Sequence, residues 1–127
     1  MHAHCTAGST NGSVTVAFSN MDEAIGYTLK LPSTFADAEV HGLGARRVEY
    51  HLTPADDEGI NTRRLLLNNA TALAVGDKAE LPELHGLLVP AGSSGSISVA
   101  PVSIGFAVFP DAQAPACIGG SLHALRA

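Results

Sequence analysis

A chain of 127 residues with a formal net charge of −5 has the length of one domain and can bury a hydrophobic core. Hydrophobic residues make up 46% of it and charged residues 15%, which is too apolar for intrinsic disorder. Seven Lys and Arg against 12 Asp and Glu argue against nucleic-acid binding through phosphate neutralisation. The 13 Gly and 7 Pro interrupt the chain too often for long helices. No apolar run reaches the roughly 18 to 20 residues of a membrane span, and no signal-peptide pattern is present.

Alternating apolar residues predict strands in the first half of the chain. A strand over residues 13–19 would bury Val14, Val16 and Phe18. A second strand over 27–31 would end at Pro32, which cannot donate to a sheet ladder. A third strand over 47–52 is predicted to turn its apolar residues to the core and its charged ones to solvent. These are Val48, Tyr50 and Leu52 on the buried side, and Arg47, Glu49 and His51 on the solvent side.

The second half predicts further strands separated by turn residues. Segments 62–67 and 72–75 flank Asn68-Asn69-Ala70-Thr71, and asparagine tolerates the positive φ of a tight hairpin turn. Short apolar segments follow at 85–90 and 97–100. Strand 102–109 is expected to bury Val102, Ile104, Phe106 and Val108. About seven or eight strands with frequent turn signals favour an all-β fold, a two-sheet antiparallel β-sandwich.

No cluster of residues predicts a catalytic, metal or cofactor site. His2-x-His4-Cys5 offers three potential metal ligands, but a structural zinc site needs about four and no second pair lies nearby in sequence. The run Asp56-Asp57-Glu58 lacks the spacing of a calcium loop. Carboxylates that might serve a glycosidase form no distinguishable pair; they are Glu49, Glu80 and Glu83. We therefore expect no catalytic residue, no metal and no cofactor in this chain.

The two cysteines, Cys5 and Cys117, allow either one disulfide or two buried thiols. Without a signal peptide, the residues alone favour thiols. Two sequons, which begin at Asn11 and Asn69, are compatible with passage through a secretory compartment. Both alternatives remain open on these observations.

An ordered set of motifs resembles the C-terminal domain of heparanase and its glycoside hydrolase family 79 relatives. The set comprises His4-Cys5-Thr6, Leu29-Lys30-Leu31-Pro32 with Phe35, Leu66-Leu67-Asn68, Leu81-Pro82-Glu83-Leu84, residues 101–109, and Ala114-Pro115-Ala116-Cys117-Ile118. These motifs follow the family's order at similar spacings over about residues 2–118. No single motif is diagnostic, so the resemblance depends on the set.

The resemblance implies a β-sandwich that packs against a catalytic (β/α)₈ barrel. The family's two catalytic glutamates lie in that barrel, so no residue here inherits a catalytic role. The matching cysteines are disulfide-bonded in heparanase, which reverses the preference for thiols at Cys5 and Cys117. The parent enzyme would hydrolyse β-glucuronide linkages in proteoglycan or acidic polysaccharide glycans by a retaining mechanism. A secreted or lysosomal location is also implied, with the barrel as a partner and glycans as a second candidate partner.

Two departures from the family pattern bear on domain organisation. In family members the chain continues upstream into the barrel, and the sandwich includes a strand from the segment before the barrel. This chain begins just ahead of Cys5, so we expect a fragment, a truncated gene model or a stand-alone relic. A missing borrowed strand would leave an unpaired sheet edge. Residues 1–118 are the predicted sandwich, and residues 119–127 are a predicted flexible tail.

An alternative function is a stand-alone carbohydrate-binding or adhesion β-sandwich. Such a domain would be expected to expose aromatic side chains that stack on sugar rings. The chain has no Trp, 2 Tyr and 4 Phe, and most of these fall at predicted core positions. A free-standing hydrolase is a third possibility, but no paired site supports it.

Overall fold

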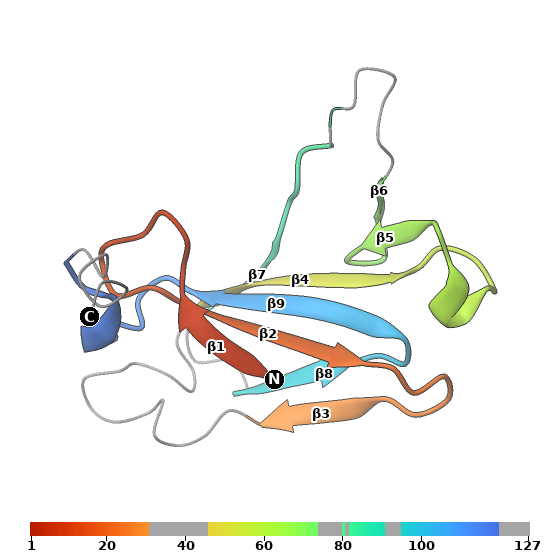
Figure 1. Cartoon of the computed structure of the whole chain (residues 1–127), viewed down its shortest axis with the longest axis horizontal. Helices are drawn as coiled ribbons and strands as arrows, with labels where there is room; N and C mark the ends of the chain where they lie inside the picture. The colour runs from red at the N-terminus through yellow and green to blue at the C-terminus, as the bar shows by residue number, and fades with distance from the viewer. Residues whose placement is uncertain (31–45, 74–79, 81, 91–94, 120–127) are drawn as a thin grey trace.

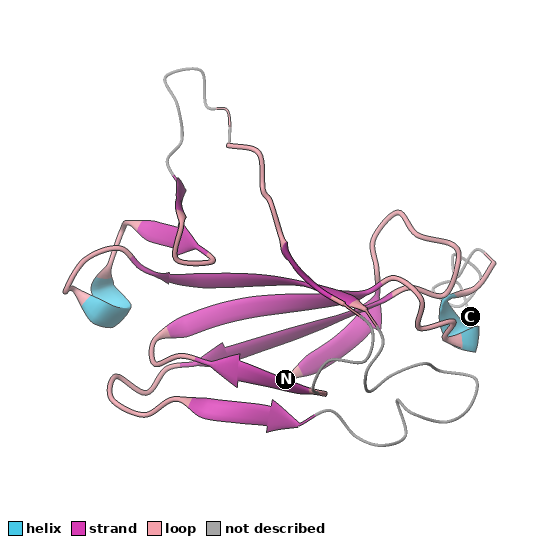
Figure 2. Cartoon of the chain, turned by 180° about the vertical axis from the view of Figure 1, so that it is seen from behind, coloured by secondary structure: helices cyan, strands magenta, loops and turns pink. Residues whose placement is uncertain are grey.

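The computed structural model describes residues 1–30, 46–73, 80, 82–90 and 95–119. These residues form nine strands and two short 3₁₀ turns (Figures 1 and 2). The strands are β1 (His2–Cys5), β2 (Val14–Asn20), β3 (Tyr27–Lys30), β4 (Arg47–Pro54), β5 (Leu65–Leu67), β6 (Thr71–Leu73), β7 (Leu87–Val89), β8 (Ser96–Val99) and β9 (Ser103–Phe109). The 3₁₀ turns are η2 (Gly59–Asn61) and η3 (Pro115–Cys117).

The strands form two antiparallel sheets. The larger has seven strands in the order β1-β2-β9-β4-β5-β6, with β7 also paired to β4, and the smaller consists of β3 and β8. One edge of β4 pairs with β7 along Arg47–Glu49 and with β5 along Leu52–Pro54. The predicted two-sheet antiparallel β-sandwich is confirmed.

The core lies between the two sheets. Its members come mainly from β2, β8 and β9: Val14, Val16, Phe18, Ile97, Val99, Ala107 and Phe109. The predicted burial of the three β2 residues is therefore confirmed. We call the side of the seven-stranded sheet that shares this core its inner face, and the opposite side its outer face.

The prediction for the face of β9 is wrong, because Ile104 and Phe106 lie on the outer face and are 45% and 38% exposed. The inner positions of β9 are Ser103, Gly105, Ala107 and Phe109. The cause is the pairing with β2, since directly opposed residues of neighbouring strands project to the same face. Phe18 is paired with Gly105, and a Cβ at that glycine would lie 2.3 Å from the Phe18 ring. A small residue is therefore required there.

The prediction for the face of β4 is wrong for the same reason. Arg47 and Glu49 are 4% and 6% exposed on the inner face, and His51 lies half-buried beside them. Register with β9 places the apolar residues outside, in the pairs Val48↔Val108, Tyr50↔Phe106 and Leu52↔Ile104. Alternation predicted the strand correctly, but not which side would meet the second sheet.

The predicted hairpin is confirmed, since β5 and β6 are joined through Asn68 and Asn69 with φ of 50° and 56°. Several predictions concern residues outside the described ranges. They are the end of the second strand at Leu31 and Pro32, the end of segment 72–75, the family-like motif residues Phe35 and Leu81, and the tail beyond Gly119.

Candidate functional site

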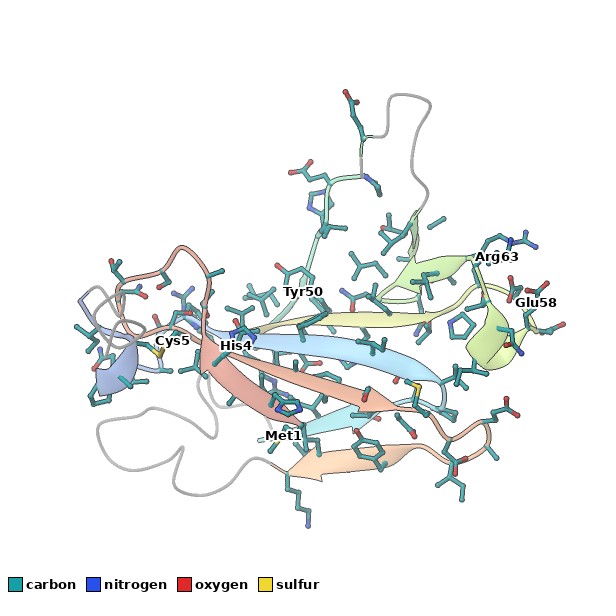
Figure 3. The ribbon with its side chains drawn as sticks, in the orientation of Figure 1. Met1, His4, Cys5, Tyr50, Glu58 and Arg63 are labelled. Atoms are coloured by element: carbon teal, nitrogen blue, oxygen red, sulfur yellow. A yellow bond between two sulfur atoms is a disulfide. The ribbon has the colours of Figure 1, made fainter. Side chains whose placement is uncertain are left out.

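The outer face of the seven-stranded sheet carries a continuous apolar surface. Strands β9, β4, β5 and β6 contribute to it in neighbouring rows through their registers. Its apolar residues are Val48, Tyr50, Leu52, Leu65, Leu67, Leu73, Ile104, Phe106 and Val108. Figure 3 shows Tyr50 on this side of β4, away from β3 and β8. A soluble protein rarely leaves such a surface uncovered unless another molecule or domain binds it.

A shallow hollow of about 350 Å³ lies in this surface. Its walls come from strands β2, β4, β5, β6 and β9 and from the segment that precedes β7. They are formed by Thr15, Tyr50, Leu52, Leu67, Leu73, Leu84, Phe106 and Val108. Almost every wall group is apolar, so the hollow suits apolar side chains better than a polar substrate.

The segment before β7 covers one side of the outer face. Gly86 packs so closely on β4 that a Cβ there would lie 2.1 Å from Val48 Cγ1 and 2.8 Å from Tyr50 Cζ. Only glycine allows this approach. Leu84 and Leu88, next to this contact, remain 49% and 64% exposed, so the segment extends the apolar surface.

The inner face holds a charged cluster on β4. Arg47 Nε donates to Glu49 Oε1 at 2.6 Å, and His51 Nε2 lies 2.7 Å from Glu49 Oε2. Arg47 Nη2 also donates to the backbone oxygen of Ser96 on β8, which ties the two sheets together. The ring of His51 stands 5.5 Å from that of Phe18. A buried charge is costly without partners, and here each carboxylate oxygen of Glu49 has one.

The pKa of Glu49 reflects this environment. Burial by itself would raise the pKa, but the hydrogen bonds from His51 and Arg47 and their charges outweigh it, so the pKa of Glu49 lies below its ordinary value. The carboxylate therefore stays ionised near neutral pH. Both of its oxygens are already bonded within the protein, so the cluster is suited to holding the sheets together rather than to transferring protons to a substrate.

Asn68 completes the edge of β4 between β5 and β7. Its Oδ1 accepts from the backbone N–H of His51 at 2.8 Å, and its Nδ2 donates to the backbone oxygens of Glu49 and His85. Its own backbone N–H donates to the oxygen of His51 at 2.8 Å. One side chain thus satisfies the backbone groups that no neighbouring strand reaches.

Cys5 and Cys117 form a disulfide, with Cα atoms 5.3 Å apart. This is the pairing that the family resemblance implies. Backbone hydrogen bonds hold the same region, from Gly12 N–H to the Cys117 oxygen and from Gly119 N–H to the Thr10 oxygen, both 3.1 Å. The disulfide therefore joins β1 to η3, and the backbone hydrogen bonds join residues 10–12 to residues 117–119.

The other candidates from the sequence are not brought together into a site. His2 and His4 lie on the exposed strand β1, and Cys5 is in the disulfide. Within the described ranges, no group of three or more His, Cys, Asp and Glu side chains could hold a metal ion. Asp56 pairs with Arg64 at 3.4 Å, and Glu83 with His85 at 3.5 Å.

The two sequon asparagines are exposed. Asn69 lies in the turn between β5 and β6, where its Oδ1 accepts from Thr53 at 3.2 Å. Asn11 precedes β2, and its Oδ1 accepts from the Ser13 backbone at 3.3 Å. Both asparagines therefore lie at the surface of the described structure.

Comparison with known proteins assigns no family. Neither a scan against protein-family models nor a search of curated proteins found a match to this chain. In the described part of the chain, no helix has the length and apolar character needed to cross a membrane. The class of protein that the fold defines is thus an antiparallel β-sandwich, and its candidate site is an apolar interaction surface.

Sequence reasoning missed both the outer face and the inner charged cluster. The periodicity of β4 and β9 was recognised, but the larger apolar set was assigned to the core. One signal was present: Ser103, Gly105 and Ala107 are small, and a face of small residues accommodates large side chains from a neighbouring strand. Phe18, the partner of Gly105, supplies that bulk.

Proposed function

We propose that this chain is a non-catalytic accessory β-sandwich of a heparanase-like glycoside hydrolase. Its parent would hydrolyse β-glucuronide linkages in proteoglycan or acidic polysaccharide glycans through two carboxylates on a (β/α)₈ barrel. The sandwich would brace that barrel and contribute no reacting group.

The observation that carries this proposal is the outer apolar face. Its central residues Tyr50, Ile104 and Phe106 come from adjacent strands, and two of them are more than a third exposed. A sheet with one face on its own core and large apolar residues on the other is suited to a position between two layers. The outer ring of a (β/α)₈ barrel consists of helices, which would supply a matching apolar surface.

Two further features support the proposal. The disulfide joins the cysteines that match the family's pair, and the ordered motifs extend over most of the chain. The smaller sheet consists of β3 and β8 among the described residues, and we propose that a strand from elsewhere in a parent protein extends it. A disulfide and exposed sequons also suit an oxidising compartment, so we propose a secreted or lysosomal location.

The first test reads the gene. The reading frame upstream of the Met1 codon is expected to encode a (β/α)₈ barrel with two active-site glutamates. The proposal would be contradicted by an in-frame stop codon directly before the Met1 codon, with only non-coding sequence farther upstream.

The second test assays the purified chain on a β-glucuronide substrate. No turnover is expected, because neither catalytic glutamate lies in this chain. Turnover that survives purification to homogeneity would sink the accessory role and require a catalytic pair among the carboxylates present here.

The alternative function, a stand-alone carbohydrate-binding sandwich, is favoured by one observation. Tyr50 and Phe106 are directly paired across β4 and β9 on the outer face, and Phe106 is 38% exposed, so this surface offers an accessible aromatic side chain. Glycan-array binding that is lost in Phe106→Ala and retained in Ile118→Ala, an exposed residue beyond that face, would favour this alternative.

A further inference from the structure

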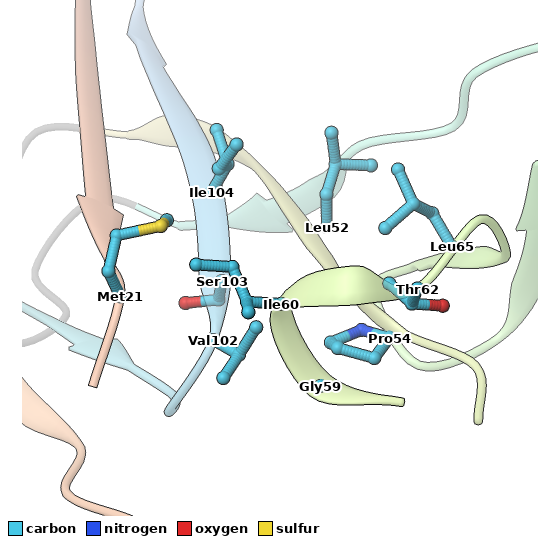
Figure 4. Close-up of a pocket in the computed structure, with 10 residues that line it drawn as sticks. All are labelled: Met21, Leu52, Pro54, Gly59, Ile60, Thr62, Leu65, Val102, Ser103 and Ile104. Atoms are coloured by element: carbon cyan, nitrogen blue, oxygen red, sulfur yellow. The ribbon is translucent and has the colours of Figure 1, made fainter. Parts of the chain in front are cut away.

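A second apolar groove lies at the end of the sandwich, where β2 ends, β9 begins and η2 crosses the end of β4 (Figure 4). Its volume is about 170 Å³, enough for one large side chain but too small for a sugar chain. The lining residues are Met21, Leu52, Pro54, Gly59, Ile60, Thr62, Leu65, Val102, Ser103 and Ile104. Of these, Met21 and Ile60 are 49% and 54% exposed, so the groove is accessible from solvent.

The backbone at Val102 is strained. Its φ is +44°, in the left-handed region that a β-branched residue rarely adopts. Its N–H donates to the oxygen of Asp22 at 2.9 Å, and Ser103 Oγ donates to Ala100 at 2.7 Å. This backbone conformation places the Val102 side chain in the groove wall. It costs conformational free energy that glycine would not incur at the same φ.

The rim of the groove is acidic. The adjoining segments 22–23 and 56–64 contain five carboxylates against two guanidinium groups, and one of those guanidiniums is paired with Asp56. Glu23 stands directly at the wall, since its Oε1 would be 3.5 Å from a Cβ at Gly59. Figure 3 shows Glu58 next to the short turn η2.

Two of the rim carboxylates are held in the charged form. Hydrogen bonds from the backbone N–H groups of Ala24 and Ile25 lower the pKa of Asp22. A hydrogen bond from Thr62 lowers the pKa of Asp56. Both carboxylates therefore stay ionised at neutral pH.

We propose that this groove binds a segment of a partner protein that presents one large apolar side chain flanked by lysine or arginine. The apolar side chain fills the space between Met21, Ile60 and Val102, while its basic neighbours face the acidic rim. This charge complementarity selects a basic segment over an acidic one. The groove shares Leu52, Leu65 and Ile104 with the outer face, but binding of this segment to the isolated chain requires neither a barrel nor a glycan.

The test uses two synthetic peptides and the complete chain. The probe is Gly-Lys-Lys-Leu-Phe-Lys-Lys-Gly, and the matched peptide has glutamate in place of every lysine. Methyl NMR spectra of the protein are recorded during titration with each peptide. The lysine peptide is expected to shift the methyl signals of Met21, Ile60 and Ile104, with a binding constant that weakens as salt is raised from about 0.05 M to about 0.5 M.

The variants separate binding from folding. Ile60→Ala should weaken the lysine peptide about fivefold or more, since it removes a groove wall. Ile118→Ala is the matched control, because Ile118 is 53% exposed but lies at the disulfide end. The affinity of this variant for the lysine peptide should change by less than about twofold. Glu23→Gln should lower affinity for the lysine peptide and reduce its salt dependence.

Val102→Gly distinguishes a binding role of Val102 from a purely structural one, because the two roles predict different changes in thermal stability and peptide affinity. The thermal midpoint should stay equal or rise, because glycine relieves the positive φ, while the peptide affinity falls. A lowered midpoint with unchanged affinity would overturn the role assigned to Val102.

Three results would overturn the proposal as a whole. These are equal shifts with both peptides, no shift at the groove methyls with either, or concentration-dependent shifts of those methyls without peptide. The last result would identify a second copy of this chain as the occupant.

Discussion

At the scale of single residues, side chains on β4 and its neighbours satisfy groups that the strands leave unpaired. Asn68 supplies an acceptor and a donor to the backbone of β4. These contacts lie between the part of β4 that pairs with β7 and the part that pairs with β5. Glu49 is held between Arg47 and His51 on the same strand. Each of these arrangements predicts a measurable effect.

We expect Asn68→Gly to lower the free energy of unfolding by about 1 to 3 kcal/mol, because it leaves the Glu49 and His51 backbone groups without partners. Glycine keeps the positive φ of 50° accessible, so the loss measures the side chain and not the backbone. Urea denaturation gives the value. Asn69→Gly is the control, since its φ of 56° is similar and its side chain accepts from the Thr53 hydroxyl instead of bonding the β4 backbone. Equal losses in both variants would contradict the role of Asn68.

The pH dependence of stability follows from Glu49. Its pKa is lowered in the folded state, so its contribution is present above the unfolded pKa of about 4.3 and is lost as pH falls through the folded value. Stability should therefore decrease below about pH 5. Glu49→Gln should flatten that decrease in urea titrations from neutral to acidic pH. Some pH dependence of the free energy of unfolding is expected to remain from Asp22 and Asp56, whose pKa values are also lowered. An unchanged pH dependence in Glu49→Gln would contradict the role assigned to Glu49.

At the scale of elements, β9 has two apolar faces with different roles. Its inner residues pack on β2 and β8, whereas its outer residues join those of β4 in an accessible surface. Two phenylalanines on this strand lie on opposite faces and provide a matched comparison.

Phe109→Ala should lower the free energy of unfolding by about 3 to 5 kcal/mol, because it opens a cavity in the core, where Phe109 is 1% exposed. Phe106→Ala should cost less than about 1.5 kcal/mol in the isolated chain, because Phe106 is 38% exposed. Chemical denaturation of both variants measures the difference. Equal costs would mean that the outer face is buried in solution, as in a self-associated form, and sedimentation would then show a larger species.

At the scale of the whole molecule, the disulfide connects residues 112 positions apart. Cross-linking limits the unfolded chain, so loss of the bond should lower stability by up to about 4 to 5 kcal/mol on the chain-entropy model. Comparison of the thermal midpoints of the oxidised protein and of Cys5→Ala/Cys117→Ala measures this contribution.

The pairing itself is checked by mass. Protein from an oxidising compartment should be lighter than its reduced form by two hydrogens and should not react with an alkylating agent before reduction. Two alkylatable thiols in the native sample would refute the bond.

Local patterns predicted the elements well. Alternation over 13–19, the apolar segment 97–100 and the asparagine pair at 68–69 marked strands and the hairpin, because strand period and turn geometry depend on neighbours in sequence. The family resemblance, not the spacing, indicated the pairing of Cys5 with Cys117. The candidate site was not predicted, since the face of β9 depends on its register with a strand more than 80 positions earlier.

The sequence by itself determined the class of this protein: a single all-β chain, acidic and turn-rich, with alternating strands and one potential cross-link. Only the tertiary structure decided which side of β4 and β9 is buried. The reason is steric, since the Phe18 ring occupies the space above Gly105 and admits no side chain there. Ile104, Phe106 and Tyr50 therefore face outward, and the charged row of β4 lies inside, held by Arg47, Glu49 and His51.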